Sequence, residues 1–387
     1  MKTAYNQNWL KNLSVLKEAN DWAKQSIISR DQLDAIRAAY VSGFYHPNFI
    51  IRILLIIATF TALSGVTGLL VLFVVEIDES MLSFLALIYG VVSFAVLEKI
   101  VIRNMRHYKS GVTEALLYHS IAFTVGGFAG VFDFDEYLFT LAVMIVCAFA
   151  AFRYLDLISS TVSILSFAYL LFAILNDSGE IVQKFIPLVF IAVFTGVYFL
   201  TRRIKQNPET EIWRHPLLIL EVLSLIFIYA AGNYFVVREM STEMLNLYLE
   251  EGQDIPLAIV FYLLTVIIPI VYLYYAITRR DIVMLRVSLA VLAFSAFTFK
   301  YYFSLGHPEY TLTAAGIILL GICLYLFRLL KTPKNGYTHE NILKEKWAAT
   351  NPEAFIISQT MGGNQVVPDA GTGEGGSFGG GGATGKY

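Results

Sequence analysis

Charged side chains are scarce in this chain. Asp, Glu, Lys and Arg make up 15% of the 387 residues, whereas 57% are hydrophobic and the mean hydropathy is +0.62. A water-soluble domain needs a more polar surface, so this composition excludes a soluble globular protein and predicts that lipid is the solvent for most of the chain. The formal net charge is -2 and no block of basic residues stands out. We therefore expect no nucleic-acid partner.

Cysteine, histidine and catalytic motifs are also sparse. The two cysteines, Cys147 and Cys323, lie within apolar runs, which favours small buried hydrophobes over a disulfide or a metal site. The six histidines are scattered, and the chain has no GxSxG, no HExxH, no phosphate-binding glycine loop and no Cys/His cluster. We expect no cofactor, no metal and no enzymatic activity. A membrane-embedded hydrolase or transferase stays open without a motif in its favour.

An uncharged apolar run at 53–75 is the first clear feature of the chain. It exceeds the ~20 residues that cross a hydrocarbon core of ~30 Å. Nine further apolar segments follow, which predicts an all-α, polytopic integral membrane bundle of about ten transmembrane helices. The segments are 50–75, 81–97, 112–132, 137–152, 155–175, 183–201, 216–237, 255–278, 282–302 and 311–330.

The distribution of basic residues predicts the orientation of the bundle. Lys and Arg gather in short cytoplasmic loops, and here they follow every second segment. The basic residues after the second, fourth, sixth, eighth and tenth segments are Lys99, Arg103, Arg106, Lys109, Arg153, Arg202, Arg203, Lys205, Arg214, Arg279, Arg280, Arg328, Lys331 and Lys334. The opposite loops hold only Lys184, Arg238 and Lys300. Both termini are therefore predicted to be cytoplasmic.

Two regions outside the bundle flank the membrane domain at 49–330. Residues 1–48 predict a cytoplasmic helix pair, in which Ser29 and Gln32 form a capping box and Leu33 begins an apolar stripe. The pair either docks a partner or simply packs on the membrane domain. Residues 331–360 form a cytoplasmic juxtamembrane segment, and the glycine-rich stretch 361–387 predicts a disordered tail, because it cannot bury enough apolar surface to order itself.

Polar side chains inside apolar segments are costly and usually face the bundle interior. The functional hypothesis is a cavity open to the cytoplasm and lined by acidic groups and hydroxyls. The alternative is that these groups pair with one another and only orient the helices. Glu221 is the strongest functional candidate, because it lies deepest and has no cation within a helical turn. The candidate cluster comprises Glu114, Arg153, Asp156, Ser160, Ser163, Glu221 and Arg286.

Small residues and one proline predict special helix contacts. The pairs Gly126/Gly130 and Ser64/Gly68 have the spacing that lets neighbouring helices approach closely. Pro269 should kink its helix or leave a carbonyl without its usual donor. The longer connection at 238–254 predicts a short helix on the outer interface, either a lid or a plain connector.

The opening of the chain, through WLKNL, DWAKQSIISRDQLDAI and YHPNFIIRILLIIATFTALSGVTGLL, resembles bacterial polytopic membrane proteins of the DUF2157 family. The likeness covers mainly the first seventy or so residues and implies an inner-membrane protein without an established activity, so it brings no functional residues. The ending SFGGGGATGKY is similar to the glycine-rich tails of some TPM-domain membrane proteins. The TPM domain itself is absent from the sequence.

Two functional classes follow from these patterns. The first is a structural or interaction protein that docks partners through its cytoplasmic termini. The second is a small-solute transporter with a cytoplasm-facing acidic cavity, for which ten helices with both ends inside is a familiar plan. An inverted repeat would favour the transporter. Segments one to five and six to ten show no such correspondence, since Pro269 has no counterpart in the third segment.

Overall fold

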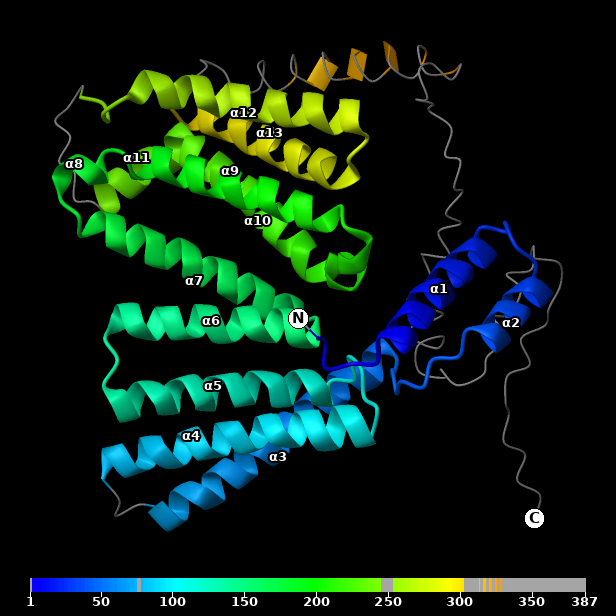
Figure 1. The fold of residues 1–387 in the computed structure, drawn as a ribbon. Coiled ribbons are helices and arrows are strands. Elements are labelled where there is room, and N and C mark those ends of the chain that lie inside the picture. Colours follow the sequence, from blue (N-terminus) through cyan, green and yellow to red (C-terminus); the bar gives the residue numbers. More distant parts are fainter. Residues whose placement is uncertain are drawn as a thin grey trace, which may run out of the picture.

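The computed structural model describes residues 2–74, 78–244 and 253–302, together with single positions between 313 and 331. Helices account for nearly all of this part of the chain (Figure 1). The predicted tenth segment lies mostly outside the described residues, as do the juxtamembrane segment and the glycine-rich tail. The helices are α1 Gln7–Lys24, α2 Arg30–Ala39, α3 Phe49–Val74, α4 Glu79–Ala95, η1 Val96–Asn104, α5 Val112–Phe132, α6 Glu136–Tyr154, α7 Leu157–Asn176, α8 Glu180–Gln183, α9 Ile186–Lys205, η2 Pro208–Trp213, α10 Arg214–Gly232, α11 Tyr234–Glu243, α12 Ala258–Arg279 and α13 Ile282–Tyr302.

Nine helices among the described residues are long and apolar enough to cross a membrane. They correspond one by one to the first nine predicted segments, and the third and ninth have the predicted bounds. The chain is thus a polytopic helical membrane protein. The count of ten and the orientation stay predictions.

The spanning helices lie side by side and alternate in direction. Consecutive helices pack as antiparallel pairs, chiefly α4 with α5, α6 with α7, α9 with α10 and α12 with α13 (Figure 1). One end of the bundle holds the loops 105–111, 155–156, 206–213 and 280–281, and we call it the basic end. The other, the acidic end, holds the loops 133–135 and 177–185. The buried apolar core falls into two main clusters, one among η1, α5 and α6 with the N-terminal segment and one among α7, α9, α10, α12 and α13.

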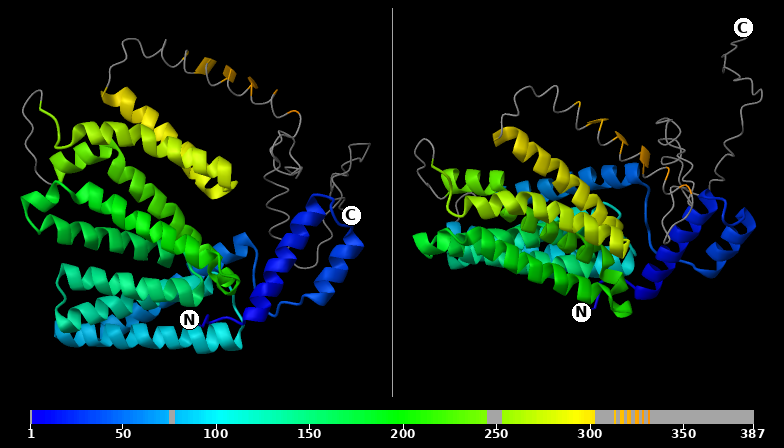
Figure 2. Two further views of the ribbon diagram at one scale, coloured as in Figure 1. Left: turned by 45° about the horizontal axis from the view of Figure 1, so that its top comes forward. Right: turned by 90° about the horizontal axis from the view of Figure 1, so that it is seen from above.

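The N-terminal helices α1 and α2 form a hairpin that projects beyond the basic end of the bundle (Figures 1 and 2). Asn6 caps α1 by accepting from the backbone N–H groups of Asn8 and Trp9. The predicted capping box of α2 is present: Ser29 accepts from the Gln32 N–H, and the Gln32 side chain accepts from the Ser29 N–H. The two helices bury Ala19 and Leu33 against each other.

The second spanning helix extends past its predicted end at residue 97. After Ala95 it continues to Asn104 as the π-helix η1. Wide turns of this kind are rare and usually short, and they often mark functional sites. The extension carries Glu98, Lys99 and Arg103 beyond the apolar part of the helix, at the basic end.

The close approach between α4 and α5 does not use the predicted glycine pair. A side chain on Gly126 would meet open space, and the same is true of Gly68 on α3. A Cβ atom on Gly127 would instead collide with the backbone of Leu87, and one on Gly90 with the backbone of Thr124. Only Gly130 of the predicted pair lies in the contact, against Ser83. The spacing rule identified small residues correctly, but it does not tell which face of α5 meets α4.

Two interruptions shape the helices, one at the middle of α12 and one at the acidic end of α10. Pro269 is buried within α12 and cannot donate to the carbonyl of Thr265, one turn earlier. The hydroxyl of Ser295 on α13 donates to that carbonyl instead, at 2.9 Å. The seventh predicted segment ends five residues early, because Asn233 stops α10 and caps α11. α11 begins before the predicted interfacial stretch 238–254, of which residues 245–252 lie outside the described residues.

Candidate functional site

The candidate polar residues do not form one cavity. Glu114 lies in the first turn of α5, where its carboxylate meets Arg52 of α3 at 2.7 Å. The same carboxylate accepts from the Gly111 N–H and the Thr113 hydroxyl, each at 2.7 Å. These donors satisfy Glu114 fully and fasten the start of α5 to the start of α3.

Asp156 and the two candidate serines have local structural partners. Asp156 caps α7 by accepting from the Ser159 N–H at 2.7 Å, and it also accepts from the Tyr118 hydroxyl at 3.0 Å. Ser160 donates to the carbonyl of Asp156, and Ser163 donates to the carbonyl of Met144 on α6. The predicted polar stripe therefore joins α7 to α5 and α6.

Arg153 turns away from Asp156. Its guanidinium pairs with Glu98 of η1 and donates to the carbonyl of Lys2 at 2.9 Å. The Tyr154 hydroxyl also donates to Glu98. Arg153 thus joins α6 to η1 and to the N-terminal segment before α1, and it does not close an acidic cavity.

Glu221 is 2% exposed and lies on α10 beside α9. Contrary to the expectation from the sequence, its carboxylate has a cation partner: Lys205 at the end of α9 forms an ion pair with it. The interpretation of Glu221 as an unpaired carboxylate rested on its own helix, and the partner comes from the preceding one. Arg286 does not join this group and is exposed on α13.

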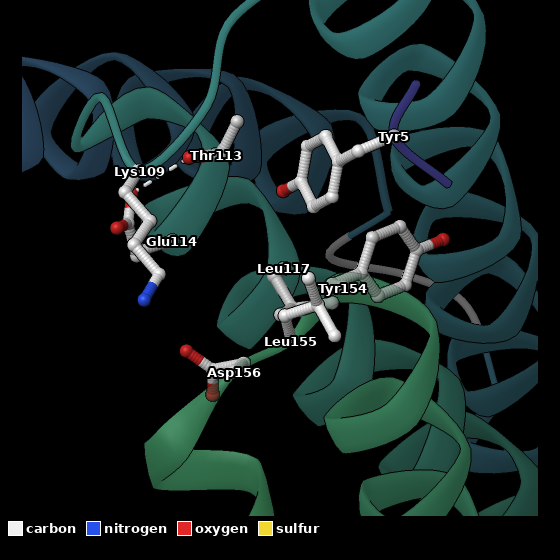
Figure 3. Close-up of a pocket in the computed structure, with 8 residues that line it drawn as sticks. All are labelled: Tyr5, Lys109, Thr113, Glu114, Leu117, Tyr154, Leu155 and Asp156. Carbon is white, nitrogen blue, oxygen red and sulfur yellow. Dashed lines mark hydrogen bonds between the residues drawn. The ribbon is translucent and has the colours of Figure 1, made fainter. Parts of the chain in front are cut away.

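Glu114 and Asp156 do share one small cavity at the basic end (Figure 3). Lys109 lies beside Glu114 with its ammonium on the side of Asp156, while Tyr5 and Tyr154 line the other side. The space open to the centre of a water molecule is about 10 Å³. That is close to the least volume that holds a single ordered water. No solute fits there in this conformation.

Burial and neighbouring charges shift the pKa values of Lys109 and Tyr5, which line this cavity. Burial lowers the pKa of Lys109, and the nearby Arg52 lowers it further, while Glu114 and Asp156 oppose the shift. Burial raises the pKa of Tyr5 well above its usual value, and neighbouring Tyr108 and Glu114 add to the effect. Tyr5 therefore stays a neutral phenol that packs on Tyr108 with ring centroids 4.9 Å apart.

Sequence reasoning missed a buried polar network near the acidic end. Asn233 is fully buried between Tyr229 and Thr298, and its amide donates to both at 2.9 Å. Beside it, the Tyr234 hydroxyl donates to Asp254 at 2.6 Å and accepts from Arg238 at 2.6 Å. The Gly232-Asn233 pair inside the seventh segment was the available signal, since both residue types favour helix ends.

No group of three His, Cys, Asp or Glu side chains that could hold a metal occurs within the described residues. Cys147 is buried in α6, and Cys323 lies outside the described part of the chain. Comparison with known proteins adds nothing to the site: no family model, curated protein or solved structure matches the chain.

Proposed function

We propose that this chain is a structural or interaction protein of a bacterial inner membrane, which docks a cytoplasmic partner through the α1–α2 hairpin. The observation that carries the proposal is a rigidly anchored hairpin with an uncovered outer surface. The resemblance to DUF2157 proteins bears on the inner membrane and not on the activity. A contribution from the glycine-rich tail belongs to the same proposal.

The anchor of the hairpin is an aromatic cluster at the basic end of the bundle. Tyr5, Phe44 and Tyr108 pack edge to face or tilted, with ring centroids 4.9–5.9 Å apart. Tyr45 forms two backbone hydrogen bonds with the loop 105–111. Its N–H donates to the Arg106 carbonyl at 2.9 Å, and its carbonyl accepts from the Tyr108 N–H at 3.1 Å. The hairpin is therefore fixed on both sides of its base.

The outer part of the hairpin has apolar side chains that are exposed among the described residues. Ile27 at the turn is 57% exposed, Val41 is 64% exposed and Trp22 is 44% exposed. Within the described part of the chain, α2 packs on α1 and its remaining faces are exposed. Because the hairpin projects beyond the ends of the spanning helices (Figure 2), these apolar groups favour contact with a protein.

The transporter alternative lacks the features that it needs in this conformation. The cavity beside Glu114 and Asp156 holds about one water, and Glu221 is paired. The break at Asn233 ends a helix of 19 residues, about 28 Å long, so it lies near a membrane boundary. Transporters place broken helices near the midplane.

The deciding experiment uses complementation of a deletion strain. Trp22→Asp/Ile27→Asp should insert normally yet fail to restore the parental phenotype, because the charges disrupt an apolar contact. The control, Ile181→Asp, alters an apolar residue at the acidic end that is even more exposed, at 75%, and should complement fully. Full complementation by the hairpin variant at matched protein abundance would contradict docking.

A photo-crosslinking residue at Ile27 provides a direct readout. We expect a discrete cross-linked product from position 27 and none from position 181. Products that are equal at both positions, or absent from every hairpin position, would count against the proposal.

A further inference from the structure

A cleft on η1 combines unpaired cations with an apolar wall. It is lined by Phe94, Ala95, Glu98, Lys99 and Arg103, and the space open to water-sized groups is about 220 Å³. This is far larger than the cavity beside Glu114. The cleft belongs neither to the candidate cluster nor to the proposed docking surface.

The charge in this cleft is net positive. Lys99 and Arg103 are exposed, and neither has an ion pair or hydrogen bond within the described part of the chain. The carboxylate of Glu98 is already neutralised by Arg153 and receives the Tyr154 hydroxyl. Two cations are thus left without a counter-charge at one edge of the bundle.

The position of the cleft relative to lipid follows from helix length. The helix from Glu79 to Asn104 has 26 residues, whereas ~20 cross the hydrocarbon core. With Glu79 at the acidic boundary, Lys99 and Arg103 reach the headgroup layer of the opposite leaflet. The residues four and eight positions before Lys99 are Ala95 and Val91, and both are exposed. One face of this helix therefore runs from apolar groups to cations over a few turns.

We propose that this cleft binds the phosphate of an anionic membrane lipid, with Lys99 and Arg103 as the phosphate ligands and the face of α4 through Val91 and Ala95 as the acyl-chain contact. Two features favour a lipid over a free phosphate. The cations stand at headgroup depth, and the wall below them is apolar. A free phosphate would gain nothing from that wall. Basic pockets at this depth are a known means of headgroup recognition.

The site can be tested on the full chain in a nonionic detergent. Native mass spectrometry would follow the binding of palmitoyl-oleoyl phosphatidylglycerol, with palmitoyl-oleoyl phosphatidylcholine as the lipid of equal chains and no net charge. Each cation near the headgroup contributes about fivefold in affinity. Lys99→Gln/Arg103→Gln should therefore bind phosphatidylglycerol roughly 25-fold more weakly. Its binding of phosphatidylcholine should not change.

The matched control is Arg203→Gln/Arg286→Gln. It removes the same charge from two exposed positions near the basic end and should bind phosphatidylglycerol like the wild type. An equal loss in both double variants would overturn the proposal, because general attraction to the basic end would then explain the binding. Displacement of the lipid by an equal concentration of inorganic phosphate would overturn the assignment to a lipid. If the double variant fails to fold, Lys99→Gln and Arg103→Gln carry the test singly, each with an expected loss of about fivefold.

Discussion

Three carboxylates at the basic end, two of them buried and Asp281 partly buried, each pair with a cation from another element. Glu114 joins α5 to α3 through Arg52, Glu221 joins α10 to α9 through Lys205, and Asp281 meets Arg202 at 3.2 Å. A charge removed from water is tolerated only with a partner, because desolvation costs several kcal/mol per ion. The pairs therefore fix which helices lie together, and they leave little free charge for a solute.

The pair of Glu221 and Lys205 allows a direct test of this structural role. Glu221→Gln should lower the free energy of unfolding by roughly 3 kcal/mol, since it leaves a partly buried ammonium unpaired. Glu221→Met/Lys205→Met should recover most of the loss, because an apolar pair of similar size needs no counter-charge. Thermal unfolding in detergent measures both. An unchanged melting temperature in Glu221→Gln would show that the pair does not hold α9 against α10.

Tyr108 predicts a loss of stability at high pH. Burial raises its pKa to about 12, helped by Glu114 and opposed by Arg52. An unfolded tyrosine ionises near pH ~10. Above that pH the unfolded chain releases a proton that the folded chain keeps, so stability falls as pH rises.

Tyr108→Phe removes the ionisable hydroxyl and with it this dependence of stability on pH. Relative to wild type, the variant should gain about 1 kcal/mol in free energy of unfolding between about pH 9 and pH 11. Tyr45→Phe is the control, since Tyr45 is exposed and adjoins the same loop. Urea unfolding at the two pH values measures the difference. A parallel pH dependence of wild type and Tyr108→Phe would show that Tyr108 is not the group responsible.

At the scale of helices, the tightest contact is the seam between α4 and α5. Gly90 and Gly127 face the backbone of the opposite helix, and Gly130 faces Ser83. In a bilayer, apolar side chains gain little by packing on one another rather than on lipid. Close backbone packing therefore contributes much of the association between the two helices. This seam therefore determines the position of η1 and of the loop that anchors the hairpin.

Adjacent glycines on α5 provide a matched pair of variants. Gly127→Ala should destabilise the protein by about 1–3 kcal/mol, because a Cβ atom collides with the Leu87 backbone and α5 must move away. Gly126→Ala should be neutral or slightly stabilising, since that position faces open space and alanine favours helix. Thermal unfolding of the two variants compares their stabilities directly. Equal effects at both positions would contradict the seam.

At the scale of the whole molecule, the grouping of basic loops at one end predicts a single orientation. The hairpin lies at that end, so it should be cytoplasmic. A cysteine at position 27 should resist a membrane-impermeant maleimide in intact cells, whereas one at position 181 should react. A reporter fused after Tyr387 should be active in the cytoplasm if the predicted tenth segment spans the membrane. Labelling at position 27 in intact cells would reverse the orientation.

The amino-acid sequence by itself determined the helices, because spanning length and exclusion of charge act on each segment locally. Segment 112–132 became α5 with the same bounds, and the capping box of Ser29 and Gln32 formed as expected. The candidate site was predictable only as a set of polar residues. The cavity beside Glu114 brings in Asp156 as expected, but also Tyr5 from the segment before α1, which no local pattern indicated.

Only the tertiary structure decided which residues meet. Lys205 neutralises Glu221 from another helix, Gly127 rather than Gly126 faces α4, and the Ser295 hydroxyl satisfies the carbonyl that Pro269 leaves free. Each of these outcomes depends on the rotation of one helix against its neighbour. In a sequence that is apolar on nearly all faces, helical periodicity carries little information about that rotation, so the partners emerge only from packing.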